Sequence, residues 1–402
     1  MRLLVLLGCA LLSLNFIGSD PADLIFVAVG GLILLTSPGT LLFHDIHPIA
    51  RLTMALVVAF YVLSCLAGWR SPSFILYSVS GMLFALSLYW ATEHDDRAPV
   101  GLALLGGFVL LNALILVLSS VGLWPLSIVF DLFLHGRFRG PSGDPNMTGL
   151  TAAFAVYFFL DRAIRPNAST SGTLLSYTGL IGAMLILLTS GSRSAWAATA
   201  AGLAVYLLVA RRAISVRMVG AGFALVAGVM VISMGAFSAS NNVEDVSERF
   251  RTILVQSDSA EQERFGFVYT RAALAVAADF PLGIGPGMTP LYTGVSSVDG
   301  HPIGAHNSYV EVLVENGWAT AVLLFGLLCV AWPRVYRLAQ ADLFYNDVSC
   351  RTILAGLTAT AIFGMGHDLL AWRIGWIFPV LAILAAFSNR YPAGVLGAPV
   401  RA

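Results

Sequence analysis

Apolar runs close to the length needed to cross a bilayer recur along the whole chain. A transmembrane helix needs about 20 predominantly apolar residues. The runs lie at roughly 2–17, 24–43, 53–69, 73–91, 99–122, 147–160, 173–189, 195–210, 217–237, 317–332, 350–370 and 372–388. This pattern predicts an all-α polytopic membrane protein of about 12 transmembrane helices, built as a single membrane domain that is embedded in the lipid bilayer.

Composition supports this class. Hydrophobic residues make up 58% of the chain and charged residues 11%, whereas a soluble protein has roughly 25% charged residues. The formal net charge is zero, which argues against a nucleic-acid partner because such a partner requires a basic excess or patch. All 22 basic residues are arginine. Arginine keeps its charge in any environment and binds phosphate with a planar fork, although GC-rich codon usage would give the same bias.

Arginines in the short connections indicate the orientation. With the amino terminus in the cytoplasm, most of them fall on the cytoplasmic side, as the positive-inside rule requires. These are Arg2, Arg51, Arg97, Arg162, Arg165, Arg211, Arg212, Arg217, Arg334, Arg337, Arg390 and Arg401. The longest polar interval, 238–316, then faces outward, which in a bacterium means the periplasm. We therefore expect a multi-pass inner-membrane protein whose active site faces the periplasm.

The 238–316 loop has internal structure of its own. Apolar residues recur at helical spacing between 261 and 279, which predicts a helix that ends before Pro281. A glycine-rich segment, Pro281-Leu282-Gly283-Ile284-Gly285-Pro286-Gly287, follows. It lacks the flanking strand and helix of a dinucleotide fold. We expect a tight turn that brings backbone close to a ligand or to a helix.

Arginines on the outward side are candidates for binding an anion. Arg193 lies in a Ser-Gly-Ser-Arg-Ser segment between two apolar runs, where a charge at the membrane edge is costly and small polar residues resemble an anion nest. It could instead snorkel to lipid headgroups. Arg264 and Arg271 are seven residues apart, so they share a helix face, which could equally be a solvated face paired with nearby acids.

His306 is the candidate base. It lies in the segment Ala305-His306-Asn307-Ser308-Tyr309, and histidine is the side chain best suited to accept a proton near neutral pH. A lone histidine is more often a structural residue. Four further residues on the same predicted face could line the site or lie at headgroup level: Arg137, Arg139, Asn146 and Asn307. We find no cluster of metal-ligating spacing in the sequence and expect no metal and no cofactor.

Together these features resemble the O-antigen ligase and polymerase family. The resemblance covers most of residues 140–335. The most specific match is the ligase pattern of histidine, then Asn, Ser or Gln, nine residues, glycine, two residues, and Gly, Thr or Tyr. Here it reads His306, Asn307, residues 308–316, Gly317, Trp318-Ala319 and Thr320. Polymerases of the family are similar to a pattern of arginine, ten residues and glycine in their loops. No glycine stands at that spacing after seven of the outward arginines, Arg137, Arg139, Arg193, Arg249, Arg251, Arg264 and Arg271.

The resemblance implies transfer of a glycan from undecaprenyl diphosphate to an acceptor sugar of the lipid A core, without a metal. It implies that Arg193 and Arg264 bind the diphosphate, with Arg271 as the alternative to Arg264, and that His306 deprotonates or orients the acceptor hydroxyl. A base on one face and a leaving group on the other predict inversion at the anomeric carbon.

Three other functions stay open from the sequence. A polymerase of O-antigen or exopolysaccharide would use a second lipid-linked glycan as acceptor. A transporter of lipid-linked sugars usually carries ionisable residues near the bilayer midplane and internal symmetry, neither of which we find. A helix-bundle scaffold of an envelope complex is the remaining alternative.

Overall fold

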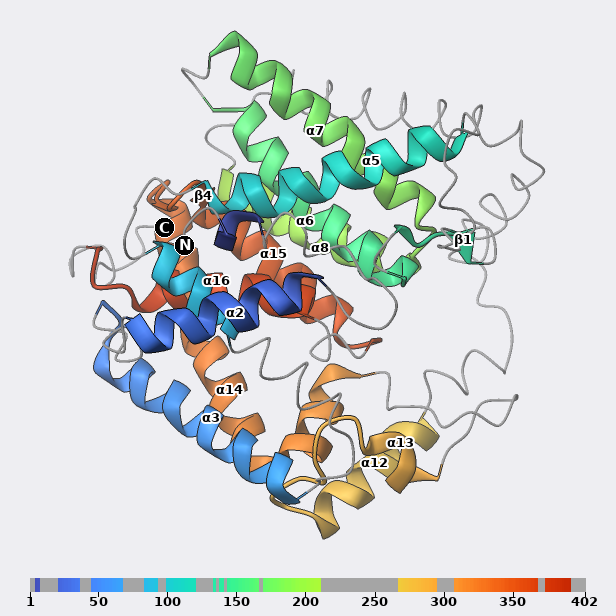
Figure 1. Cartoon of the computed structure of the whole chain (residues 1–402), viewed down its shortest axis with the longest axis vertical. Coiled ribbons are helices and arrows are strands. Elements are labelled where there is room, and N and C mark those ends of the chain that lie inside the picture. The colour runs from blue at the N-terminus through green and yellow to red at the C-terminus, as the bar shows by residue number, and fades with distance from the viewer. Residues whose placement is uncertain are drawn as a thin grey trace. The chain divides into compact units, whose positions relative to one another are not determined.

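The computed structural model describes residues 4–7, 21–36, 45–67, 83–92, 99–120, 133–134, 137–140, 143–165, 169–210, 267–294, 307–367 and 373–391. Most of these residues are helical (Figure 1). The labelled helices are α2 (Pro21–Thr36), α3 (Pro48–Ala67), the π-helical η2 (Leu102–Gly106), α5 (Gly107–Ser120), α6 (Pro145–Ala163), α7 (Thr170–Thr189), α8 (Arg193–Ala210), α12 (Phe267–Asp279), α13 (Thr289–Thr293), α14 (Ser308–Gln340), α15 (Cys350–Phe363) and α16 (Arg373–Phe387). Residues Leu83–Thr92 are helical as well.

Two short antiparallel hairpins accompany the helices. One pairs β1 (Phe133–Leu134) with β2 (Arg137–Phe138), and the other pairs β3 (Phe344–Tyr345) with β4 (Val348–Ser349). The predicted helical class is confirmed. We did not predict the hairpins, because strands of two residues are too short to show an alternating pattern.

The predicted spans coincide with helices wherever the structure describes them, although several boundaries differ. Within the described ranges, four helices are long and apolar enough to cross a membrane: Pro48–Leu66, Thr170–Thr189, Arg193–Ala210 and Ser308–Gln340. Five shorter apolar helices are also found among the described residues. Helix α15 ends at Phe363, so the helix is shorter than the predicted span 350–370. The predicted span 217–237 and most of 2–17 lie outside the described residues, so the number twelve stays a prediction.

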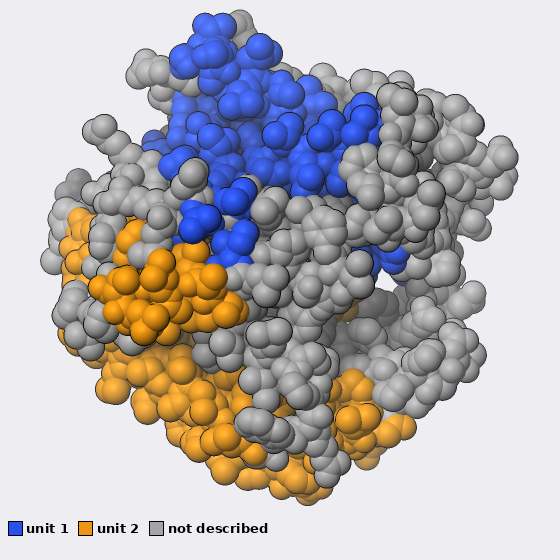
Figure 2. Space-filling view, in the orientation of Figure 1, with its two compact units in different colours: residues 1–25, 94–256, 338–359 blue, residues 26–93, 257–337, 360–402 orange. Residues whose placement is uncertain are grey.

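The chain divides into two compact units (Figure 2). Unit 1 comprises residues 1–25, 94–256 and 338–359, and unit 2 comprises residues 26–93, 257–337 and 360–402. Each unit is assembled from segments far apart in the sequence. The partition into one membrane domain with an embedded 238–316 loop stays a prediction.

Helix α6 is the centre of unit 1. Almost all of its side chains are buried, and it packs against α7, α8 and η2. Glycines allow the close approach: a Cβ at Gly149 would lie 2.6 Å from Ser190 Oγ and 2.9 Å from Ala195 Cβ. Deeper in the unit, the Tyr157 hydroxyl lies 3.0 Å from the carbonyl oxygens of both Ala198 and Thr199. Helix α6 therefore holds the beginning of α8 in a fixed place.

Hydrogen bonds and an ion pair involving Asp161 stabilise the C-terminal end of α6. Asp161 is buried and accepts hydrogen bonds from the Tyr206 hydroxyl (2.9 Å) and from Arg165 Nη2 (2.9 Å). Asp347, in the β3–β4 turn, accepts from the backbone N–H groups of Gly101 (2.8 Å) and Leu102 (2.9 Å). A carboxylate at the first residues of a helix satisfies N–H groups that have no partner within the helix. Asp347 thereby joins the β3–β4 hairpin to η2.

In unit 2 the start of α3 is joined to the end of α16. The backbone N–H of His47 donates to Phe387 O (2.9 Å), and that of Asn389 donates to Asp45 O (2.7 Å). Helix α12 packs on α13. A small apolar core, formed by Ala273, Ala277, Ile284, Met288 and Val314, joins α12 and the glycine-rich turn to α14.

Candidate functional site

The Ser-Gly-Ser-Arg-Ser segment forms a tight turn between α7 and α8. Ser190 ends α7, with its N–H donating to Ile186 O (2.9 Å) and its Oγ to Leu187 O (2.7 Å). Gly191 adopts a positive φ of 57°, a left-handed conformation that glycine adopts without steric cost. Ser192 Oγ accepts from Ala195 N (3.3 Å), as an N-cap does. Arg193 is therefore the first residue of α8, and it is half-buried.

A second helix begins beside this turn. Asp144 is the N-cap of α6, and its Oδ1 accepts from the N–H groups of Asn146 (2.6 Å) and Met147 (3.3 Å). Pro145 occupies the first helical position, where its missing N–H costs nothing. The Asp-Pro-Asn sequence is thus a helix start, and it fixes the backbone of Asn146.

Side chains join the two helix starts. Arg137 Nε donates to Ser190 O (2.9 Å), and Arg137 Nη2 donates to Asn146 Oδ1 (2.6 Å). Ser192 Oγ lies 3.0 Å from the same Asn146 Oδ1. We call these four residues, Arg137, Asn146, Ser190 and Ser192, the Arg137 cluster. It brings two of the predicted site residues against the turn that carries a third, Arg193.

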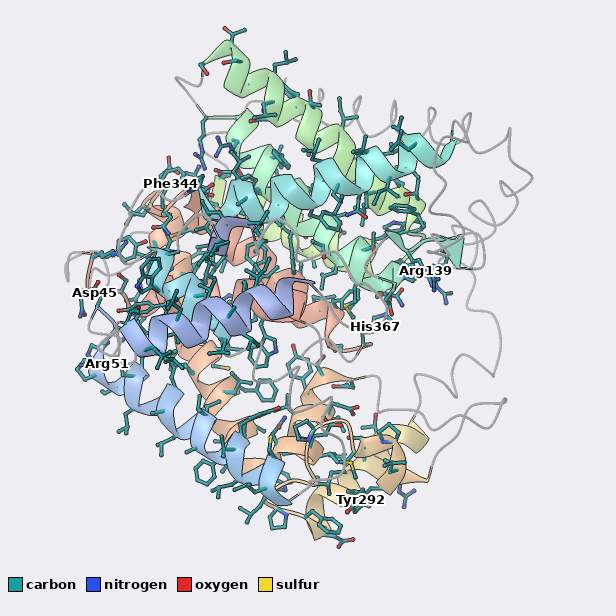
Figure 3. All side chains as sticks on the ribbon, in the orientation of Figure 1. Asp45, Arg51, Arg139, Tyr292, Phe344 and His367 are labelled. Atoms are coloured by element: carbon teal, nitrogen blue, oxygen red, sulfur yellow. The ribbon has the colours of Figure 1, made fainter. Side chains whose placement is uncertain are left out.

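Arg139 contributes to the same region through its backbone. It follows β2 directly (Figure 3), and its carbonyl oxygen accepts from Thr148 Oγ1 (2.6 Å). This bond ties the β1–β2 hairpin to α6. Whether Arg139 lines a substrate site stays a prediction.

In unit 2 the glycine-rich turn forms backbone hydrogen bonds with the first part of α14. Gly283, Gly285 and Gly287 all have positive φ, at 88°, 94° and 72°. The N–H groups of Ile284 and Gly285 donate to Val314 O (3.0 Å) and Glu315 O (2.9 Å), and the N–H of Trp318 donates to Pro281 O (3.0 Å). The turn therefore brings backbone against a helix, as one of the two predicted alternatives stated.

Gly317 interrupts α14 at the point of contact. Its φ of 81° and ψ of 168° separate two helical segments, so the helix begins at Ser308 rather than at 317 as predicted. A Cβ at Gly317 would lie 2.5 Å from the carbonyl carbon of Leu282 and 2.6 Å from Pro281 O. The glycine of the ligase pattern therefore occupies a position that requires glycine in both conformation and space.

Asn307 caps α14. Its Oδ1 accepts from the N–H groups of Tyr309 (3.0 Å) and Val310 (3.2 Å), and its Nδ2 lies 3.3 Å from Met365 O. Asparagine and serine, two of the residues that the ligase pattern allows here, are both good N-caps. This contact explains the residue type at 307 by helix capping. A substrate-lining role for Asn307 stays a prediction.

Ser308, the residue after this cap, contacts the turn that follows α15. Ser308 N donates to Gly364 O (2.8 Å), and Ser308 Oγ donates to His367 O (2.6 Å). The ring of His367, which is labelled in Figure 3, stacks on Phe363, with centroids 4.5 Å apart. The start of α14 therefore has a fixed place on the end of α15.

Arg271 lies on the exposed side of α12, whereas Ala273 and Ala277 on the same helix are fully buried. The predicted helix is present, but its buried residues are Ala273 and Ala277 and not the predicted apolar position Ala275, which is exposed; Arg271 lies at the surface of unit 2. Arg264 and His306 lie outside the described residues, so their predicted roles stay predictions.

Comparison with known families gives a match to the O-antigen ligase model over residues 178–325, just over a third of the chain. Residues 178–325 are therefore similar to the O-antigen ligase family. A comparison with curated proteins finds no match. The matched range confirms the resemblance to the O-antigen ligase and polymerase family. It runs from within α7 to within α14, and it contains Arg193, the glycine-rich turn and Gly317.

Two buried carboxylates within the matched range were not among the predicted site residues. Glu311 and Glu315 are buried on the first segment of α14, and Glu315 Oε1 accepts from the N–H (3.3 Å) and Oγ1 (3.1 Å) of Thr289. Asn307, Glu311 and Glu315 recur every four residues, a stripe that would have indicated a helix face had 308–316 been interpreted as helical. Among the described residues no group of three or more His, Cys, Asp or Glu side chains could hold a metal ion, and a metal-independent reaction stays a prediction.

Proposed function

We propose that this protein is an O-antigen ligase that transfers a glycan from undecaprenyl diphosphate to a sugar of the lipid A core, on the periplasmic face of the inner membrane. The observation that carries the proposal is the O-antigen ligase family match, because residues 178–325 contain Arg193, Arg264, Arg271 and His306. Helices of membrane-spanning length and composition support a lipid-linked substrate.

The chemistry needs a base and charge stabilisation. An acceptor hydroxyl attacks the anomeric carbon, its proton passes to His306, and the bond from that carbon to the diphosphate oxygen breaks. Undecaprenyl diphosphate leaves with the bonding electron pair. Its charge is met by Arg193 together with Arg264 or Arg271, without a metal. Attack opposite the leaving group inverts the anomeric centre.

A polymerase would use the same chemistry with a second lipid-linked glycan as acceptor. The pattern from His306 to Thr320 favours the ligase, because it fits the ligase form at every specified position. The position of Gly317 in a glycine-requiring break of α14 gives that pattern a structural basis.

A deletion strain tests the proposal. Lipopolysaccharide gels from this strain should show bare core, and long glycan should accumulate on the lipid carrier. Wild-type chain should restore capped core, whereas His306→Ala and Arg193→Ala should not. Arg337→Ala is a matched control, because Arg337 lies in the last turn of α14, outside the family match.

Each other result has a definite meaning. Core capped with a single repeat unit in the deletion strain would make the protein a polymerase. Unchanged lipopolysaccharide would refute an O-antigen function. Purified chain in lipid vesicles, given both substrates and excess EDTA, should retain its activity; loss of activity that Mg²⁺ restores would refute the metal-independent mechanism.

A further inference from the structure

Resting on the proposed function, we propose that Asn146 donates its side-chain amide N–H groups to the diphosphate of the donor lipid, and that Arg137 is the positioning residue that orients this amide. Both residues precede the range that matches the O-antigen ligase model. The proposal therefore adds a substrate contact in a part of the chain that the family match does not reach.

The orientation of the Asn146 amide follows from its neighbours. A guanidinium can only donate hydrogen bonds, so the Asn146 atom that lies 2.6 Å from Arg137 Nη2 must be the carbonyl oxygen. Ser192 Oγ lies 3.0 Å from the same oxygen. Rotating the amide by half a turn would set N–H groups against the guanidinium. The NH₂ group of Asn146 therefore points away from Arg137.

That NH₂ group is available to a ligand. Within the described part of the chain, Asn146 Nδ2 has no hydrogen-bond partner, and the Asn146 side chain is half-buried. The neighbouring Asp144 Oδ1 already accepts the backbone N–H groups of Asn146 and Met147. Because the side chain is half-buried, this oriented donor is open to an acceptor oxygen from a ligand.

The charge around the amide favours an anionic acceptor. Ser192, which contacts Asn146 Oδ1, is followed directly by Arg193, and Arg137 lies on the other side of the same oxygen. A guanidinium beside the amide, with a second arginine one residue after its Ser192 partner, suits phosphate oxygens, which accept charge-assisted hydrogen bonds. The diphosphate of the donor lipid is the anion that the proposed reaction supplies.

Arg137 acts through Asn146 rather than on the substrate. Its Nε and Nη2 groups are used by Ser190 O and Asn146 Oδ1. These bonds hold the turn before Arg193 and the start of α6 in one arrangement. A donor held in place before binding loses little entropy when the substrate arrives.

Asn146→Asp separates a substrate contact from a structural one. Aspartate has nearly the same shape and keeps acceptor oxygens for Arg137 and Ser192, but it replaces the NH₂ group with a second oxygen that repels phosphate. We expect wild-type thermal stability and roughly a tenfold to hundredfold weaker affinity for undecaprenyl diphosphate, measured by thermal-shift titration of purified full chain. Asp144→Asn, which still caps α6, should bind like wild type.

The outcomes are distinct. Wild-type affinity in Asn146→Asp would overturn the proposal. Binding that weakens as expected, in a chain with no transferase activity toward any sugar acceptor, would leave the amide contact standing while the proposed function fails. If wild-type chain does not bind undecaprenyl diphosphate at all, both fail.

Arg137→Lys tests the positioning role. Lysine keeps the charge but lacks the planar fork that reaches two acceptors. If Arg137 acts through Asn146, Arg137→Lys should weaken binding about as much as Asn146→Ala, and the double variant should be little worse than either. A double variant whose loss equals the product of the two single losses would show that Arg137 binds the diphosphate independently and would overturn its positioning role.

Discussion

Substituting Gly317 by alanine is the sharpest test of the structure around the ligase pattern. Gly317 lies between the two helical segments of α14, where Trp318 N donates to Pro281 O (3.0 Å). Its φ of 81° and ψ of 168° fall in a region that is essentially restricted to glycine. The glycine-rich turn also covers it closely.

Two costs add in the alanine variant. Holding a non-glycine residue at these angles costs about 1–3 kcal/mol. The new Cβ would lie 2.5 Å from the Leu282 carbonyl carbon and 2.6 Å from Pro281 O, and these backbone atoms cannot rotate away as a side chain can. Overpacking of this kind costs typically 1–3 kcal/mol. We expect Gly317→Ala to lower the free energy of unfolding by about 2–6 kcal/mol.

Reversible unfolding of the purified chain in mixed detergent micelles measures this loss. Gly326→Ala is the matched control, because Gly326 lies in the same helix and a Cβ there meets nothing within 4 Å. Alanine at a helical position is favoured over glycine by about 1 kcal/mol, so the control should be at least as stable as wild type. If Gly317→Ala and the Gly326→Ala control have the same free energy of unfolding, both the positive φ of Gly317 and its close contact with Pro281 and Leu282 are refuted.

Three further predictions concern other described contacts. Asn307→Ala should lower stability by about 1 kcal/mol through loss of the α14 cap, and Asn307→Ser should restore most of it; thermal unfolding of both variants checks this. Tyr206→Phe leaves Asp161 Oδ1 buried without its hydroxyl donor and should cost about 1–3 kcal/mol, whereas an unchanged unfolding free energy would contradict the contact. Burial raises the pKa of Asp347 above its ordinary value, against the lowering effect of the Gly101 and Leu102 N–H groups and of Arg162. The folded chain therefore binds this proton more tightly than the unfolded chain does, so the stability of wild type relative to Asp347→Asn should fall as the pH rises from about 4 through the raised pKa; a pH-independent difference would exclude the shift.

Much of the helical framework followed from the sequence, because the length and apolarity of a run are local properties. The described parts of the predicted spans are mostly helical, and the loop helix ends at Asp279, two residues before Pro281. The start of α14 was missed. Its first turns carry Glu311 and Glu315, so 308–316 did not stand out as an apolar run, although both carboxylates are buried.

The residue types of the candidate site were also visible in the sequence, but their contacts were not. Arg137 and Asn146 were candidates because they share a predicted face with Arg193. Only the fold brings Arg137 to Ser190, which is 53 residues away in the chain. That contact makes Arg137 a positioning residue in our proposal, a role that spacing along the chain cannot indicate.

What the sequence by itself determined is the helical class, the resemblance to the O-antigen ligase family and the residue types available for chemistry, since each is a property of local composition or of a short pattern. The tertiary structure alone decided why particular positions carry those residues. Gly317 must be glycine because Pro281 and Leu282 pack against it. Asp347 accepts the N–H of Leu102, at the start of η2, from 245 residues away in the chain. Hydrogen bonds and steric contacts between distant segments depend on how the chain packs, and packing is not encoded in any single stretch of sequence.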